Sequence, residues 1–170
     1  MARRALGRAV VQGLLSPLNV EQAKQDAFTP ASINAFRMDN ALYGIPKAVE
    51  TLVLIYNKDL IDKPLDSLQA WLDYSKTQRE QNKYGLLAKF DQIYYSWGAI
   101  GPMGGYIFAK NDGGGFNPQQ VGLNTPGAVE AVTFLKKFYA EKAFPAGILG
   151  DNGLNAIDSL FTEKKAAAVI

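Results

Sequence analysis

The sequence contains no cysteine and no histidine among its 170 residues. These two absences exclude thiol nucleophiles, disulfides, imidazole bases and the usual zinc sites. Any chemistry must therefore come from carboxylates, lysines, hydroxyls or aromatic rings. We expect no cofactor and no metal site.

An excess of one charge and a long apolar run are also missing. The chain has 18 Lys and Arg against 16 Asp and Glu, for a net charge of +2, and the basic residues are scattered. This disfavours a nucleic-acid partner. No apolar run approaches the roughly 18 residues that cross a bilayer, so we expect no direct membrane insertion. The opening MARRALGRAVVQGLL is interrupted by Arg8 and Gln12, which predicts a helix and not a signal peptide.

Signals for strands and helices alternate along the chain, as in α/β proteins. The apolar run from Val49 to Tyr56 predicts a strand covered on both faces, and GLLA and AAAVI predict two more. A tight turn is predicted at Asp39-Asn40. Helix starts are predicted near Tyr94 and at the capping residues Thr29, Ser67 and Thr125.

The two ends of the chain suggest a piece taken from something larger. AAAVI reads as a strand that stops at the last residue, and the first predicted helix has no strand before it. In a doubly wound sheet, a strand normally precedes the first helix and the chain normally continues after a strand such as AAAVI.

Glu50 stands at the head of an apolar run, in the stretch KAVETLVLIYNKDL. It is either a strand-end carboxylate half exposed to water or a group at the rim of the sheet that accepts hydrogen bonds. Burying a carboxylate without partners is costly, which favours a polar partner, but strand ends commonly lie at the surface. On the residues alone both interpretations stay open.

Three aromatic residues, Tyr94, Tyr95 and Trp97, lie within four positions. Neighbouring helix positions point about 100° apart, so the three rings cannot all face one core. An exposed ring beside Asp91 and Gln92 would suit a flat, hydroxylated ligand, because the ring covers C–H groups while the polar side chains bind hydroxyls. The alternative is that Tyr95 and Trp97 are core residues and Tyr94 is incidental.

The stretch KNDGGGFNP, residues 110–118, is predicted to be a loop from its composition. Gly113, Gly114 and Gly115 do not form a phosphate loop, because no Lys-Ser/Thr pair follows them. We interpret them as a flexible turn.

Five segments together resemble a known family. They are VVQGLLSPL, YGIPKAVETLVLIYNKDL, IYYSWGAIGPMGGYIF, TPGAVEAVTFLKKF and LFTEKKAAAVI. In order and spacing they resemble the extracellular solute-binding proteins of carbohydrate ABC importers, above all the maltose- and maltodextrin-binding proteins. The resemblance covers nearly the whole chain from about Gly7 onward.

The resemblance implies an α/β, periplasmic-binding-protein-like (type II) fragment. The fragment is mostly one lobe, with an open mixed sheet flanked by helices. It comprises a partial first lobe over residues 1–47, an interlobe crossing segment over 48–57 and a partial second lobe over 58–170. Sugar binds between the lobes in that family.

The resemblance also implies five site residues. Glu50 matches the hinge-side carboxylate that accepts sugar hydroxyls, and Tyr94 matches a stacking tyrosine. Gln92 stands where many relatives have glutamate, and Asp91 could supply the missing acidity. Tyr95, the neighbouring ring, completes the set.

The implied partners are a maltodextrin or related oligosaccharide and the membrane permease of an ABC importer, in an extracytoplasmic setting, either the periplasm or the cell surface as a lipoprotein. MARRALGR matches poorly where relatives place further polar sugar ligands. Half a cleft should bind weakly, because pockets gain affinity by surrounding their ligand.

Three alternatives remain at this point. The first is a binding protein for another oligosaccharide, and the second is a fragment that binds nothing. The third is a glycosidase that uses Glu50 and Asp91 as paired carboxylates, which requires a separation of roughly 5 to 9.5 Å.

Overall fold

A computed structural model describes residues 3–111 and 116–170. The chain divides into two compact units, Met1–Thr51 and Leu52–Ile170, and each is described by itself. The predicted flexible turn at Gly113 to Gly115 lies outside the described residues.

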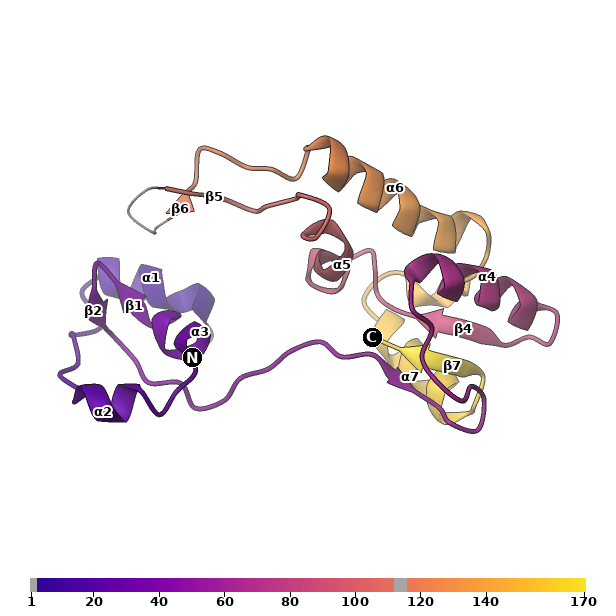
Figure 1. The fold of residues 1–170 in the computed structure, drawn as a ribbon, viewed down its shortest axis with the longest axis horizontal. Coiled ribbons are helices and arrows are strands. Elements are labelled where there is room, and N and C mark those ends of the chain that lie inside the picture. Colours follow the sequence, from indigo (N-terminus) through magenta and orange to yellow (C-terminus); the bar gives the residue numbers. More distant parts are fainter. Residues whose placement is uncertain (1–2, 112–115) are drawn as a thin grey trace. The chain divides into compact units, whose positions relative to one another are not determined.

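The unit Met1–Thr51 combines short helices with one small hairpin (Figure 1). Its elements are α1 (Arg3–Val11), α2 (Gln22–Gln25), α3 (Pro30–Asn34), β1 (Arg37–Met38) and β2 (Ala41–Leu42). β1 and β2 are antiparallel, and Asp39 and Asn40 between them have φ of 49° and 65°. Aspartate and asparagine tolerate this left-handed region, and the predicted turn is confirmed. The core residues Leu6, Ala9, Ile33 and Leu42 are buried.

The unit Leu52–Ile170 is built on a three-stranded sheet in the order β3-β7-β4 (Figure 1). Its strands are β3 (Ile55–Tyr56), β4 (Tyr84–Leu87) and β7 (Ala166–Val169). β7 runs antiparallel to β3 and parallel to β4, which confirms the mixed sheet. The AAAVI segment therefore supplies the middle strand, and its first three alanines are buried.

The prediction for residues 49–56 was wrong in extent and in burial. Only Ile55 and Tyr56 form a strand, opposite Val169 and Ala168 of β7. Val49 is 71% exposed and Val53 is 56% exposed, so this segment is not a strand covered on both faces. A run of apolar residues gives a tendency to extend, but burial depends on which elements pack over it.

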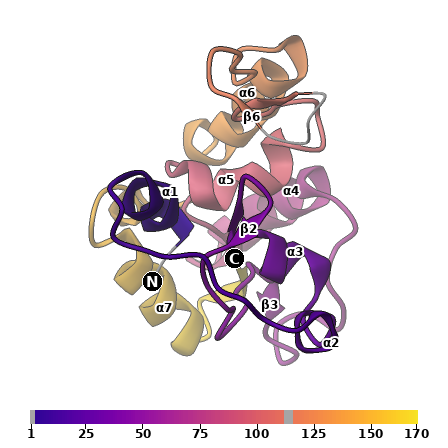
Figure 2. The same ribbon diagram turned by 90° about the vertical axis from the view of Figure 1, so that its left-hand side faces the viewer.

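Helices cover this sheet and extend beyond it. They are α4 (Leu68–Arg79), α5 (Ile93–Ile100), α6 (Pro126–Ala140), the short 3-10 helix η1 (Ala146–Ile148) and α7 (Gly153–Thr162). α4 packs on β4 and α7 packs on β7 (Figure 1). α5 lies alongside α6 (Figure 2). Two predicted caps are confirmed: Ser67 Oγ accepts a hydrogen bond from the Ala70 amide at 3.1 Å, and Thr125 Oγ1 accepts one from the Ala128 amide at 3.3 Å.

The segment 110–118 is not a loop throughout. Lys110 belongs to β5 (Ala109–Lys110), which pairs antiparallel with β6 (Phe116–Asn117). The composition of KNDGGGFNP predicted a loop, yet its first residue, Lys110, pairs with Phe116.

Close packing joins α4 to β4 at Gly85. The hydroxyl of the buried Ser75 on α4 accepts a hydrogen bond from the Leu86 amide at 3.2 Å. A Cβ at Gly85 would lie 2.6 Å from this hydroxyl and 2.9 Å from the Ser75 backbone nitrogen. Glycine therefore lets the strand approach the helix closely enough for the Ser75 bond.

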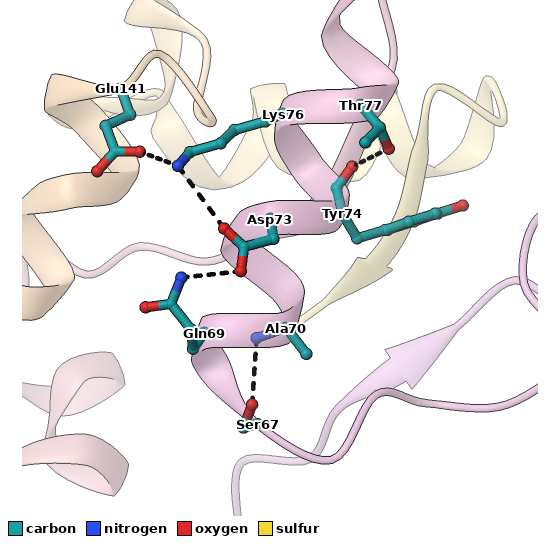
Figure 3. A network of polar contacts seen from close by, with 8 residues as sticks. All are labelled: Ser67, Gln69, Ala70, Asp73, Tyr74, Lys76, Thr77 and Glu141. Atoms are coloured by element: carbon teal, nitrogen blue, oxygen red, sulfur yellow. Dashed lines mark hydrogen bonds and ion pairs between the residues drawn. The ribbon is translucent and has the colours of Figure 1, made fainter.

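An ion-pair network connects α4 to the end of α6 (Figure 3). Lys76 lies 3.6 Å from Asp73 and also forms an ion pair with Glu141. The hydrogen bond to Glu141 raises the pKa of Lys76. Exposed pairs of this kind contribute little to stability, so the packing of the buried side chains carries most of it.

Candidate functional site

Four of the five predicted site residues come together where β4 leads into α5. We call residues 89–92 the β4–α5 turn. Asp91 and Gln92 lie in this turn, and Tyr94 and Tyr95 lie in the first helical turn of α5, whose N-cap is Gln92. Asp91, Gln92 and Tyr94 are exposed, and Tyr95 is half-buried.

The backbone of the β4–α5 turn is held at its last residue. The Gln92 amide donates to the Lys89 carbonyl at 3.1 Å. The Gln92 carbonyl accepts from the amides of Tyr95 and Ser96 and from the Ser96 hydroxyl, each at 3.1 Å. The Gln92 side chain makes no capping hydrogen bond, so its amide is available to a ligand.

Lys89, which the sequence did not single out, lies directly beneath this surface. It is only 1% exposed, and its ammonium donates to both carboxylate oxygens of Asp91, at 3.0 Å and 2.8 Å. Lysine is rarely buried unless it is paired. The signal in the sequence was its position immediately after the buried run GLLA, where a charge must find a partner.

The three aromatic residues on α5 differ in exposure, as the angle between neighbouring helix positions requires. Tyr94 is 49% exposed and meets the half-buried Tyr95 edge to face, with centroids 5.2 Å apart. Trp97 packs against the buried cluster of Ile100, Ala128 and Ala131. The expectation that at least one ring is exposed is confirmed, and the core interpretation holds for Trp97.

Phe90 and Tyr139 support the turn from the core side. The Phe90 ring packs against Phe138 and Phe144, with centroids 5.6 Å and 5.7 Å away. The Tyr139 hydroxyl is buried near the backbone of Phe90 and Asp91, but it makes no hydrogen bond of good geometry with the described residues. Burial, and secondly the negative charge of Asp91, raise the pKa of Tyr139 to about 12.

Glu50 belongs to the unit Met1–Thr51, whereas the other four candidates belong to Leu52–Ile170. Its side chain is exposed in its own segment. The site residues that the structure brings together are therefore Asp91, Gln92, Tyr94 and Tyr95. The role of Glu50 at a hinge stays a prediction.

Residues 3–111 and 116–170 hold no group of three or more acidic side chains arranged to bind a metal ion. Across the same ranges, no helix combines the length and apolar character needed to cross a bilayer. The β4–α5 turn and the first turn of α5 offer an amide and an exposed ring, which can bind hydroxyl and C–H groups.

Comparison with known proteins gives a consistent assignment. The family described as bacterial extracellular solute-binding protein matches residues 1–170. A galactooligosaccharide-binding protein of Bacillus subtilis strain 168 is 50% identical over 167 residues, covering 97% of this chain and 40% of that protein. A maltooligosaccharide ABC transporter solute-binding lipoprotein of Streptococcus pneumoniae R6 is 30% identical, covering 93% and 38%.

A solved structure is also similar. It is a cyclo/maltodextrin-binding protein complexed with maltotetraose, with a TM-score of 0.85 and 32% identity. The match covers 99% of this chain and 43% of that one. The chain thus spans about two fifths of the length of the relatives it matches. The type II, periplasmic-binding-protein-like fold is confirmed, and the relatives are named for binding and not for a reaction.

Proposed function

This chain belongs to the family of bacterial extracellular solute-binding proteins, and we propose that it binds an oligosaccharide for delivery to the membrane permease of an ABC importer. The observation that carries the proposal is the surface at the β4–α5 turn. There Tyr94, whose ring is exposed, lies two residues after Gln92, whose side chain makes no capping hydrogen bond. The proposed role is binding without catalysis.

The chemistry of this surface suits a sugar. The exposed Tyr94 ring would cover the C–H face of a pyranose, and the Gln92 amide would donate to and accept from its hydroxyls. A neutral amide does both, whereas a carboxylate only accepts. Glu50, in the unit Met1–Thr51, is proposed as a further hydroxyl acceptor.

The division into lobes is part of this proposal. A partial first lobe would span residues 1–47, a crossing segment 48–57 and a partial second lobe 58–170. The boundary between the compact units, at Thr51 and Leu52, falls inside the proposed crossing segment, which supports this division.

Two classes of oligosaccharide are candidates. Maltodextrin is the expectation from the sequence, and it is supported by a structural relative that was solved with maltotetraose. A galactooligosaccharide is supported by the relative at 50% identity, and we favour it for this reason. Both are chains of hydroxylated rings, so a tyrosine platform with a neutral amide fits either.

We propose an extracytoplasmic location for the same reasons. The family is described as extracellular, and the pneumococcal relative is named as a lipoprotein of an ABC transporter. A binding protein of this kind would meet its sugar outside the cell and pass it to the permease.

Isothermal titration of the monomeric chain with maltotetraose and, separately, with a galactooligosaccharide tests the proposal. We expect saturable heat with at least one of them. Tyr94→Ala should weaken binding about tenfold, and Tyr94→Phe, which keeps the ring, should stay close to the unsubstituted chain. No heat from the folded monomer with either sugar would overturn the proposal.

A further inference from the structure

Lys89 is a charged residue buried beside the apolar core, and apolar packing does not explain why a lysine is present there. Its neighbours in sequence, Ala88 and Phe90, are apolar and pack into the core cluster, yet Lys89 is 1% exposed and positively charged. On another side lies Gly153, at the start of α7, where an added Cβ would come within 3.1 Å of the ammonium. The lysine therefore fills a closely packed space between the end of β4 and the beginning of α7.

The side chains of Lys89 and Asp91 form an ion pair within the β4–α5 turn. The ammonium reaches both oxygens of Asp91, two residues further along the chain. The Lys89 carbonyl accepts from the Gln92 amide, which closes the same turn on the backbone side. Lys89 thus makes one side-chain contact and one backbone contact within the turn, and the Asp91 side chain, 28% exposed, is held against its ammonium.

A purely stabilising role does not require a charge at this position. Replacing a buried ion pair by well-packed apolar residues is often neutral or stabilising, because the desolvation of both ions offsets their attraction. A methionine would fill a space of similar length. What an apolar residue cannot do is direct the Asp91 carboxylate inward and keep the turn in one conformation.

We propose that Lys89 is a positioning residue of the sugar site: acting through Asp91, it holds the β4–α5 turn so that the Gln92 amide and the Tyr94 ring are presented to an oligosaccharide. The inference rests on the proposed function. It gives Asp91 a different role from the one expected from the sequence, as the counter-ion of Lys89 and not as a sugar ligand.

Lys89→Met tests the role directly, with Lys76→Met as the matched control. Both variants remove the lysine of an ion pair in the same unit, but Lys76 pairs with Asp73 and Glu141, outside the turn. Amide hydrogen exchange is measured at Gln92, Tyr95 and Ser96, whose amides bond within and beside the turn. Sugar affinity is measured by titration on the same samples.

In Lys89→Met we expect at least tenfold faster exchange at these three amides and at least tenfold weaker sugar binding. The Tyr84 amide, which bonds to the Lys165 carbonyl, should exchange as before. Lys76→Met should leave both exchange in the turn and affinity within about twofold. Unchanged exchange in Lys89→Met, or faster exchange with full affinity, would overturn the proposal.

Asp91→Asn separates positioning from direct contact. It removes the charge on the other side of the pair, so we expect faster exchange and weaker binding here too. The double variant Lys89→Met/Asp91→Asn should bind no more weakly than Lys89→Met alone, because both changes act on one contact. Losses that multiply would mean that Asp91 touches the sugar itself, which overturns the proposal.

Two further outcomes are decided by the same data. If Lys89→Met does not fold, Asp91→Asn decides alone: faster exchange with weaker binding supports the proposal, and no change in either overturns it. If the unsubstituted chain binds neither sugar, the proposed function fails. The exchange measurement then still shows whether Lys89 holds the turn.

Discussion

Replacing Tyr139 with phenylalanine examines the polar packing beneath the β4–α5 turn. The Tyr139 hydroxyl is buried near Phe90 and Asp91 and has no well-formed hydrogen bond to the residues that the structure describes. An unsatisfied buried hydroxyl costs about 1 to 3 kcal/mol, so its removal should be favourable or neutral. We expect Tyr139→Phe to raise the free energy of unfolding by about 1 kcal/mol at neutral pH.

At alkaline pH, the titration of Tyr139 gives a second, independent effect on the free energy of unfolding. The pKa of Tyr139 rises from its ordinary value of 10.0 to about 12 on folding, because burial and Asp91 disfavour the phenolate. The unfolded chain therefore loses the proton first, and stability that is present below pH 10 is lost as the pH rises toward 12. This difference corresponds to about 2.7 kcal/mol, which screening at the partly exposed ring lowers to about 1 to 2 kcal/mol.

Urea denaturation followed by tryptophan fluorescence measures both effects. The two tryptophans, Trp71 and Trp97, both lie in the unit Leu52–Ile170. Comparing Tyr139→Phe with the unsubstituted chain at each pH cancels the titration of all other groups. The advantage of the variant should grow from pH 9 to pH 12. A variant that is less stable at pH 8, or a gap that does not change with pH, would refute this reasoning.

Two further substitutions test the packing of α4. Ser67→Ala removes the hydroxyl that accepts from the Ala70 amide, so we expect a loss of about 1 kcal/mol in the same urea experiment; an unchanged midpoint would show that the cap is not used. Gly85→Ala should cost about 1 to 3 kcal/mol because its Cβ would meet Ser75, whereas Gly98→Ala on α5, with no atom within 4 Å of the added Cβ, should gain about 0.5 to 1 kcal/mol. Equal effects of the two glycine substitutions would contradict the close approach of α4 and β4.

Features that depend on local chemistry could be predicted from the sequence. Ser67 and Thr125 cap their helices because a hydroxyl at that position can accept from a free amide, whereas Thr29 precedes α3 without a side-chain capping bond. Asp39 and Asn40 tolerate the backbone that a two-residue turn requires. AAAV was likewise predicted to be a strand, and its small apolar residues suit the buried middle position that it takes in the sheet.

Features that depend on tertiary neighbours could not be predicted in the same way. Val49 and Val53 are exposed although their run looks like a buried strand, because strand pairing with β7 involves only Ile55 and Tyr56. Lys89 was not singled out from the sequence, and the packing of α7 beside it buries the ammonium. Its contact with Asp91 is what a sequence pattern does not reveal, since it depends on the conformation of the turn.

The most direct test of the account is an NMR titration of the isotope-labelled chain with a galactooligosaccharide, following the backbone amides. Binding at the β4–α5 turn predicts saturable shifts that are largest from Asp91 to Tyr95, with smaller changes at the start of α7, where Gly153 lies beside Lys89. Saturable shifts confined to other elements, or no shifts with this sugar and with maltotetraose, would contradict an oligosaccharide site at this turn.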